Sequence, residues 1–134
     1  MKLIPNVAGA LLGLLFIVFG LDFFFHFLPQ PSAQPPADSP PGHFFAALFP
    51  TGYFKLVKLL EVIGGVLVLL PLTRNVGMLV LGPILVNIWC FHIFLTGGAS
   101  LKDPMNAGVM GLITVLALIV IVSGRKAWSG LLVR

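Results

Sequence analysis

The stretch YFKLVKLLEVIGGVLVLL, residues Tyr53–Leu70, decides the fold expected for this chain. Its length and apolar second half are typical of a membrane-spanning helix, yet its first half carries Lys55, Lys58 and Glu61. An ionisable group at that depth costs at least about 2.5 kcal/mol unless another group compensates it. Glu61 is therefore the first candidate for a functional residue.

The overall composition also indicates a membrane protein. Of 134 residues, 58% are hydrophobic and only 9% are charged, whereas soluble domains carry about 25% charged residues. The net charge of +4 does not indicate nucleic-acid binding, because the basic residues lie mostly at the ends of apolar runs, where they set membrane topology. The single cysteine, Cys90, excludes an internal disulfide and thiol–disulfide chemistry by this chain alone.

The apolar runs predict an all-α fold, an integral membrane four-helix bundle formed by residues 1–134 as one domain. Asp103-Pro104 is a helix start signal and Ser123-Gly124 a stop signal. A signal peptide is the competing interpretation of the first run, but that run is long and Pro31–Ala33 is a poor cleavage site. The four predicted spans cover about residues 7–28, 53–70, 75–95 and 104–122.

Between the first two spans, residues 29–42 hold six of the eleven prolines, which predicts an extended outer loop. The following segment, His43–Phe49, is too short to span a bilayer and places several apolar side chains on one helical face. A short interfacial helix is the first interpretation of this segment. A loop that folds over the mouth of the bundle is the alternative.

The positive-inside rule predicts the orientation of the bundle. Four spans place both termini on one side, and more basic residues fall on that side than on the other. We expect cytoplasmic termini in a bacterial inner membrane. The residues on the terminal side are Lys2, Arg74, Arg125, Lys126 and Arg134, and those opposite are Lys55, Lys58 and Lys102.

Antiparallel packing of the spans predicts that most intramembrane polar groups gather in one layer of the outer leaflet. The helical rise of ~1.5 Å per residue places these groups roughly 9–12 Å below the outer surface or nearer to it. The inner half has almost nothing polar, which argues against a transmembrane ion path and makes a small transporter the weakest hypothesis. The predicted ligand-binding candidates are Asp22, His26, Lys58, Glu61, Asn87 and His92.

Each candidate also has a purely structural interpretation. Glu61 either pairs with Lys58 or Lys55, or remains a neutral acid that binds or protonates a ligand head group. Asp22 and His26, four residues apart, either form a proton-transfer pair on one helical face or simply satisfy each other. Asn87 is expected to bond the backbone or a neighbouring helix. His92 and Cys90 point in different directions on a helix, so no metal site is predicted.

Three segments resemble the DoxX family of small four-helix membrane proteins: LLGLLFIVFGLDFFFHFLP, TGYFKLVKLLEVIGGVLVLL and GPILVNIWCFHIFL. The most specific parts are Glu61 followed by Gly64-Gly65, and the stretch from Asn87 to His92. The resemblance implies membrane location and an association with redox systems. It assigns no catalytic residue.

Together these observations predict a membrane subunit of a quinone-linked oxidoreductase system, with a pocket for a quinone or another isoprenoid lipid. The chain has no flavin, haem or iron–sulfur motif, so no covalently bound cofactor is expected and electrons would come from a partner redox protein. Phe23, Phe24, Phe25 and Phe91 would suit a flat aromatic ligand beside the polar layer. The alternative is a non-enzymatic binding or scaffold protein whose polar layer only stabilises the bundle.

Overall fold

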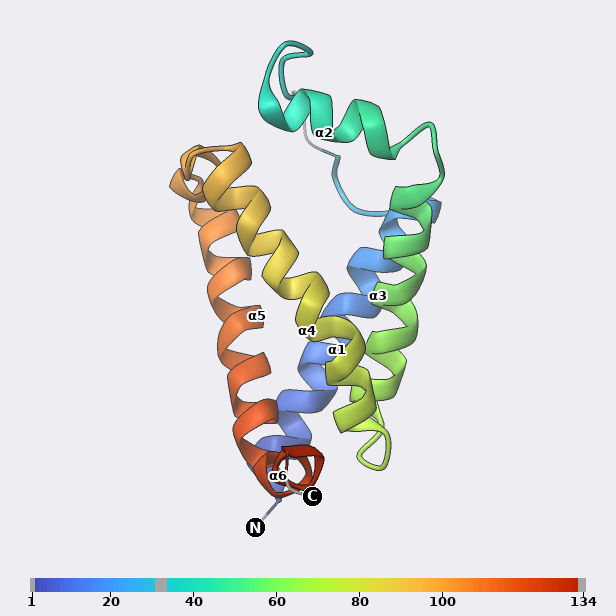
Figure 1. Cartoon of the computed structure of the whole chain (residues 1–134), viewed down its shortest axis with the longest axis vertical. Coiled ribbons are helices and arrows are strands. Elements are labelled where there is room, and N and C mark those ends of the chain that lie inside the picture. The colour runs from blue at the N-terminus through green and yellow to red at the C-terminus, as the bar shows by residue number, and fades with distance from the viewer. Residues whose placement is uncertain (1, 31–33, 133–134) are drawn as a thin grey trace.

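The computed structural model describes residues 2–30 and 34–132, and these residues form helices joined by turns and loops, with no strand (Figure 1). Residues Pro31–Ala33, which bear on the predicted cleavage site, and Arg134, which bears on the predicted topology, lie outside the described residues. The elements in chain order are α1 (Leu3–Phe25), α2 (Pro40–Leu48), α3 (Tyr53–Leu69), α4 (Arg74–Cys90), the π-helix η1 (Phe91–Leu95), the 3₁₀ helix η2 (Ala99–Lys102), α5 (Pro104–Ser123) and α6 (Arg125–Leu132).

Three helices in the described part of the chain are long and apolar enough to cross a membrane: α1, α4 continued by η1, and α5. The predicted boundaries for the last two hold closely. By contrast, α1 begins and ends about one turn earlier than predicted. It begins early because Pro5 is tolerated in a first helical turn, and it ends at Phe25 because His26 adopts a left-handed conformation with φ 52°.

α2 is a helix, as the sequence predicts, but it begins at Pro40, so residues 40–42 belong to the helix and not to the predicted extended loop; Ser39 caps it. The Ser39 hydroxyl accepts a hydrogen bond from the Gly42 backbone N–H at 3.2 Å. Proline is favourable in the first turn because its missing N–H would have had no partner there. In Figure 1, α2 crosses the end of the bundle above α3 and α4.

Glycine contacts fix the packing of α1, α3 and α4. A Cβ at Gly13 in α1 would lie 2.5 Å from the Gly65 carbonyl oxygen in α3. On the other face of α3, a Cβ at Gly64 would lie 2.5 Å from a methyl group of Leu81 in α4. Side chains at these positions would separate the helices, so glycine allows the backbones to approach closely.

α3 and α4 separate beyond this contact, towards the end where α2 lies (Figure 1). The separation follows Gly82-Pro83, where proline removes one backbone donor from the interior of α4. The apolar core fills the rest of the bundle with side chains from all four long helices. Its buried members are Ala8, Leu12, Phe16, Val68, Met78, Leu81, Leu85, Met110, Ile113, Leu116, Ala117 and Val120.

The end of the bundle remote from α2 contains a buried guanidinium, which corrects the expectation that this half has almost nothing polar. Arg74 is only 9% exposed. Its Nε donates to the Val68 carbonyl oxygen at 3.1 Å, and its Nη1 donates to Asn6 Oδ1 at 2.9 Å. Gly9 leaves room for it, since a Cβ there would collide with the guanidinium. Arg74 therefore ties α1 to the turn between α3 and α4.

We expect Arg74→Met to lower the free energy of unfolding by about 2 kcal/mol, because it leaves the buried acceptors at Val68 and Asn6 unpaired. Arg74→Lys should recover less than half of this loss, since one ammonium cannot reproduce the spacing of two guanidinium nitrogens. Denaturant titration in mixed micelles measures both values. Full recovery by lysine would mean that charge, rather than hydrogen-bond geometry, is what the position requires.

Candidate functional site

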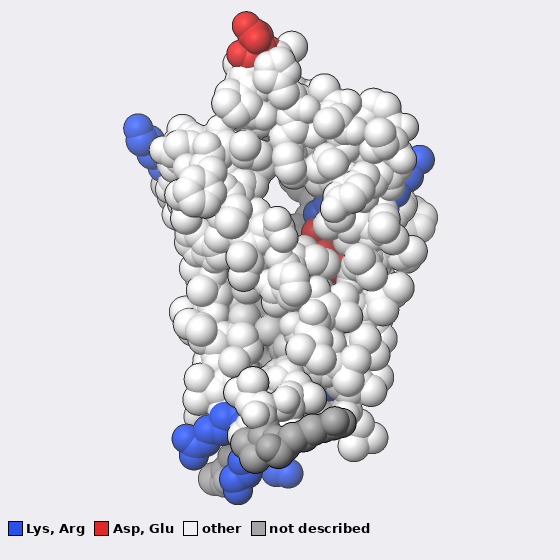
Figure 2. All heavy atoms as spheres, in the orientation of Figure 1, with Lys and Arg blue, Asp and Glu red and all other residues white. Residues whose placement is uncertain are grey.

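A cavity of about 480 Å³ lies where α3 and α4 separate, and α2 covers it. Figure 2 shows the molecule hollowed at this level, with a basic and an acidic side chain visible inside. The cavity wall is mostly apolar and aromatic. Its lining residues are Phe44, Phe45, Leu48, Tyr53, Phe54, Val57, Lys58, Leu60, Glu61, Pro83, Ile84, Asn87, Ile88 and Phe91.

The ion pair in this cavity confirms the predicted partnership of Lys58 and Glu61. Lys58 Nζ lies 3.0 Å from Glu61 Oε1 and 2.9 Å from Oε2. The two residues are three positions apart on α3, which brings their side chains onto the same helical face. The Glu61 side chain is only 4% exposed, and that of Lys58 is 18% exposed. Mutual neutralisation is what allows both charges to lie this deep.

Lys58 keeps one hydrogen-bond donor for a ligand. A lysine ammonium has three N–H groups, and the two carboxylate oxygens of Glu61 account for two of them. The ammonium also lies 5.4 Å from the centroid of the Phe54 ring, which favours a cation near the ring face. Among the described residues, no acceptor is bonded to the remaining N–H, so this donor can serve a ligand in the cavity.

Asn87 lines the opposite wall from α4. Its Nδ2 donates to the Pro83 carbonyl oxygen at 2.9 Å, which confirms the expectation that Asn87 bonds the backbone. This bond fixes the direction of the amide. Within the described residues, the Asn87 carbonyl oxygen and second amide hydrogen have no partner, so the residue can still donate to or accept from a ligand.

Aromatic rings from three helices close the cavity. Phe44 and Phe45 of α2 each lie 5.4 Å from Phe91 of η1, measured between ring centroids. Phe45 also lies 5.9 Å from Phe54 of α3 in an edge-to-face contact. These distances are those of favourable aromatic pairs. α2 is thus held against α3 and η1 chiefly by rings that also form the cavity wall.

Only one of the four aromatic residues predicted to lie beside the ligand lines the cavity. Phe91 lines the cavity, whereas Phe24 and Phe25 are exposed and Phe23 instead packs against Phe49 and Phe54. Phe44, Phe45 and Phe54 also line the cavity and were not predicted to do so. The signal was present in α2, because its apolar side chains share one helical face and need a surface to cover.

Asp22 and His26 do not join the cavity, and the predicted pair on one helical face is wrong. Asp22 Oδ1 accepts the Leu28 backbone N–H at 2.6 Å, and Oδ2 accepts the Gln30 side-chain amide at 3.2 Å. His26 is exposed and lies beyond the end of α1. Asp22 therefore stabilises the chain reversal after α1, where the helical spacing used in the prediction no longer applies.

His92 also lies outside the cavity lining, although it is close in sequence to Phe91. Its Nδ1 is 2.6 Å from the Ser100 hydroxyl, and the Thr96 hydroxyl is 2.9 Å from the same oxygen. This network joins η1 to η2 at the turn before α5. Of the six predicted ligand-binding candidates, the structure brings three together around one cavity: Lys58, Glu61 and Asn87.

Sequence and structure comparisons assign no family to this arrangement. The chain matches no family model, and no curated protein or solved structure was found to be similar to it. The DoxX resemblance therefore stays an expectation drawn from the short motifs. The function has to be inferred from the chemistry of the cavity.

Proposed function

We propose that the chain is an integral membrane four-helix bundle that binds a quinone or a related isoprenoid lipid in the cavity below α2. α3 is the fourth span in this proposal. Its 17 residues extend roughly 26 Å, close to the ~30 Å of bilayer hydrocarbon. The Lys58–Glu61 pair removes most of the cost of placing charges in this helix. α2 then lies at the membrane surface, across the mouth of the cavity.

The observation that carries the proposal is the unused Lys58 donor inside an aromatic cavity. Small-molecule sites are typically mostly apolar, with volumes of about 300–1,000 Å³ and a few placed polar groups. A flat ring bearing carbonyl oxygens matches this arrangement. One carbonyl accepts from Lys58, the ring stacks among Phe45, Phe54 and Phe91, and Asn87 is available to a second polar group.

The proposed context is a redox system of the bacterial inner membrane, with both termini in the cytoplasm. The DoxX resemblance favours this context. So does the location of the cavity, which lies between α3 and α4, two helices that the proposal surrounds with lipid. In this role the chain is the quinone-binding membrane subunit of an oxidoreductase, and a partner redox protein supplies the electrons. The residues of this chain bind and orient the ring.

The second candidate is a non-enzymatic binding or scaffold protein. It is favoured because several polar side chains already have hydrogen-bond or ion-pair partners within the protein. Glu61 is satisfied by Lys58, Asp22 by the backbone of Leu28, and His92 by Ser100. Mass spectrometry of an organic extract of the purified protein separates the candidates, since bound quinone supports the first and phospholipid alone supports the second.

We expect Phe45→Ala to lower the quinone content of the purified protein about fivefold or more. Phe45 forms part of the wall and holds Phe54 and Phe91 in place, and aromatic contacts contribute about 1 kcal/mol each. Quinone per mole of protein, measured by mass spectrometry, is the readout.

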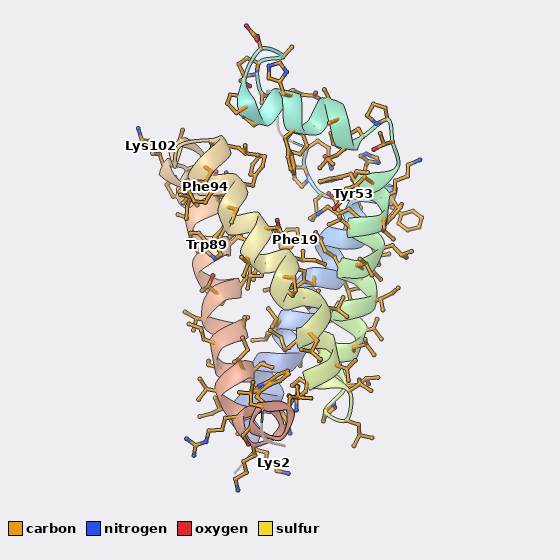
Figure 3. The ribbon with its side chains drawn as sticks, in the orientation of Figure 1. Lys2, Phe19, Tyr53, Trp89, Phe94 and Lys102 are labelled. Carbon is orange, nitrogen blue, oxygen red and sulfur yellow. The ribbon has the colours of Figure 1, made fainter. Side chains whose placement is uncertain are left out.

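Phe94→Ala is the matched control, because Phe94 is 75% exposed on η1 and does not line the cavity (Figure 3). It should leave the quinone content unchanged. Equal losses in both variants would show that bound quinone reflects the surrounding lipid rather than this cavity.

A further inference from the structure

α6, a helix that was not predicted, carries its polar and apolar side chains on separate arcs. At 100° per residue, Arg125, Lys126 and Ser129 fall on one arc, and Trp128, Leu131 and Leu132 fall on a separate, neighbouring arc. Leu131 and Leu132 are 69% and 86% exposed. The described residues of the bundle therefore leave most of this apolar arc uncovered.

The orientation of α6 differs from that of the long helices. Figure 1 views α6 end-on, whereas α5 runs along the long axis of the molecule. The corner between them is fixed by Trp128, whose indole Nε1 donates to the Ile121 carbonyl oxygen of α5 at 3.0 Å. If the long helices cross the bilayer, α6 lies parallel to its surface at the level of the last turn of α5.

The side chains at this end of the molecule carry one sign of charge. Lys2, Arg125 and Lys126 are exposed there, and Figure 2 shows basic side chains without acidic ones at this end. All four acidic residues belong to other regions: Asp22, Asp38, Glu61 and Asp103. A negatively charged surface would complement this end.

We propose that α6 is an in-plane helix that binds the anionic phospholipid head groups of the leaflet at the terminal side. Arg125 and Lys126 contact the phosphate layer, Trp128 lies at the boundary, and the two leucines enter the acyl region. A helix with one basic and one apolar face has this position in a bilayer, and juxtamembrane basic residues attract anionic lipid. The proposal requires the spanning arrangement but not the quinone site.

Bromolipid quenching in the full-length protein tests the proposal. Trp89→Phe leaves Trp128 as the single tryptophan, because the chain has two. This variant is reconstituted into phosphatidylcholine vesicles that contain a fixed fraction of either dibrominated phosphatidylglycerol or dibrominated phosphatidylcholine. Quenching of Trp128 by the anionic bromolipid should exceed quenching by the zwitterionic one at least about twofold, since basic residues near the surface concentrate anionic lipid.

Arg125→Gln with Lys126→Gln should abolish this preference while both bromolipids still quench. Lys102→Gln is the matched control, because Lys102 is exposed at the opposite end of the molecule (Figure 3), and it should keep the full preference. Equal quenching by the two lipids in the parent protein would overturn the proposal. So would weak quenching by both, which would show that a second copy or another protein covers α6.

Discussion

Replacing Glu61 with glutamine is expected to lower the free energy of unfolding by about 3 kcal/mol. The substitution keeps the size of the side chain but leaves the Lys58 ammonium in an apolar cavity without its counter-charge. Breaking a buried ion pair from one side typically costs 3–5 kcal/mol in this way. Denaturant titration in mixed micelles, followed by tryptophan fluorescence, measures the change.

The double variant Lys58→Met with Glu61→Met separates stability from ligand binding. With both charges removed, no unpaired charge is left in the cavity, and the free energy of unfolding should return to within about 1 kcal/mol of the parent value. The quinone content should nevertheless remain low, because the donor that meets the carbonyl is gone. A stable double variant that retains its quinone would show that the Lys58–Glu61 pair does not bind the ring.

Gly13→Val is expected to destabilise the bundle by about 3 kcal/mol. The Cβ alone would lie 2.5 Å from the Gly65 carbonyl oxygen and 2.9 Å from the Leu69 backbone nitrogen. Both contacts are with backbone, so neither can be relieved by rotating a side chain, and α1 must move away from α3. Overpacking of a tight interface costs about 1–3 kcal/mol and occasionally more.

Gly108→Val on α5 is the matched control, because a Cβ there meets no atom within 4 Å. Its effect should stay within about 0.5 kcal/mol, as for most exposed substitutions. Both variants are compared by denaturant titration in the same micelles. Equal destabilisation would mean that helix propensity, rather than the contact between α1 and α3, determines the cost.

The long helices and the ion pair could be predicted because their signals are local. Hydropathy and the Asp103-Pro104 start place α5, and the spacing of Lys58 and Glu61 on one helix brings their side chains together without knowledge of the partners. Asn87 was predictable for the same reason, since its bond to the carbonyl oxygen of Pro83 spans one helical turn. In both contacts the partner lies about one turn away on the same helix, so the sequence alone identifies it.

The positions of the other polar residues depend on how the helices pack together, which the spacing of residues along the sequence does not reveal. Depth along a span can be counted, but the direction of a side chain around the helix depends on its partners. Asp22 lies nearer to the end of its helix than predicted and bonds the backbone after the end of α1, because His26 leaves the helical conformation. The burial of Arg74 was not predicted either, since only the approach of Asn6 and Gly9 in the folded bundle shows it.

The Lys58–Glu61 contact also has a consequence for how the chain enters the bilayer. Both partners belong to α3, so the contact forms as soon as this one helix winds, before any tertiary packing exists. In the proposed four-span arrangement, α3 would therefore enter the hydrocarbon with this pair already neutralised and only Lys55 still charged. The pair would not have to wait for a neighbouring helix to deliver the opposite charge.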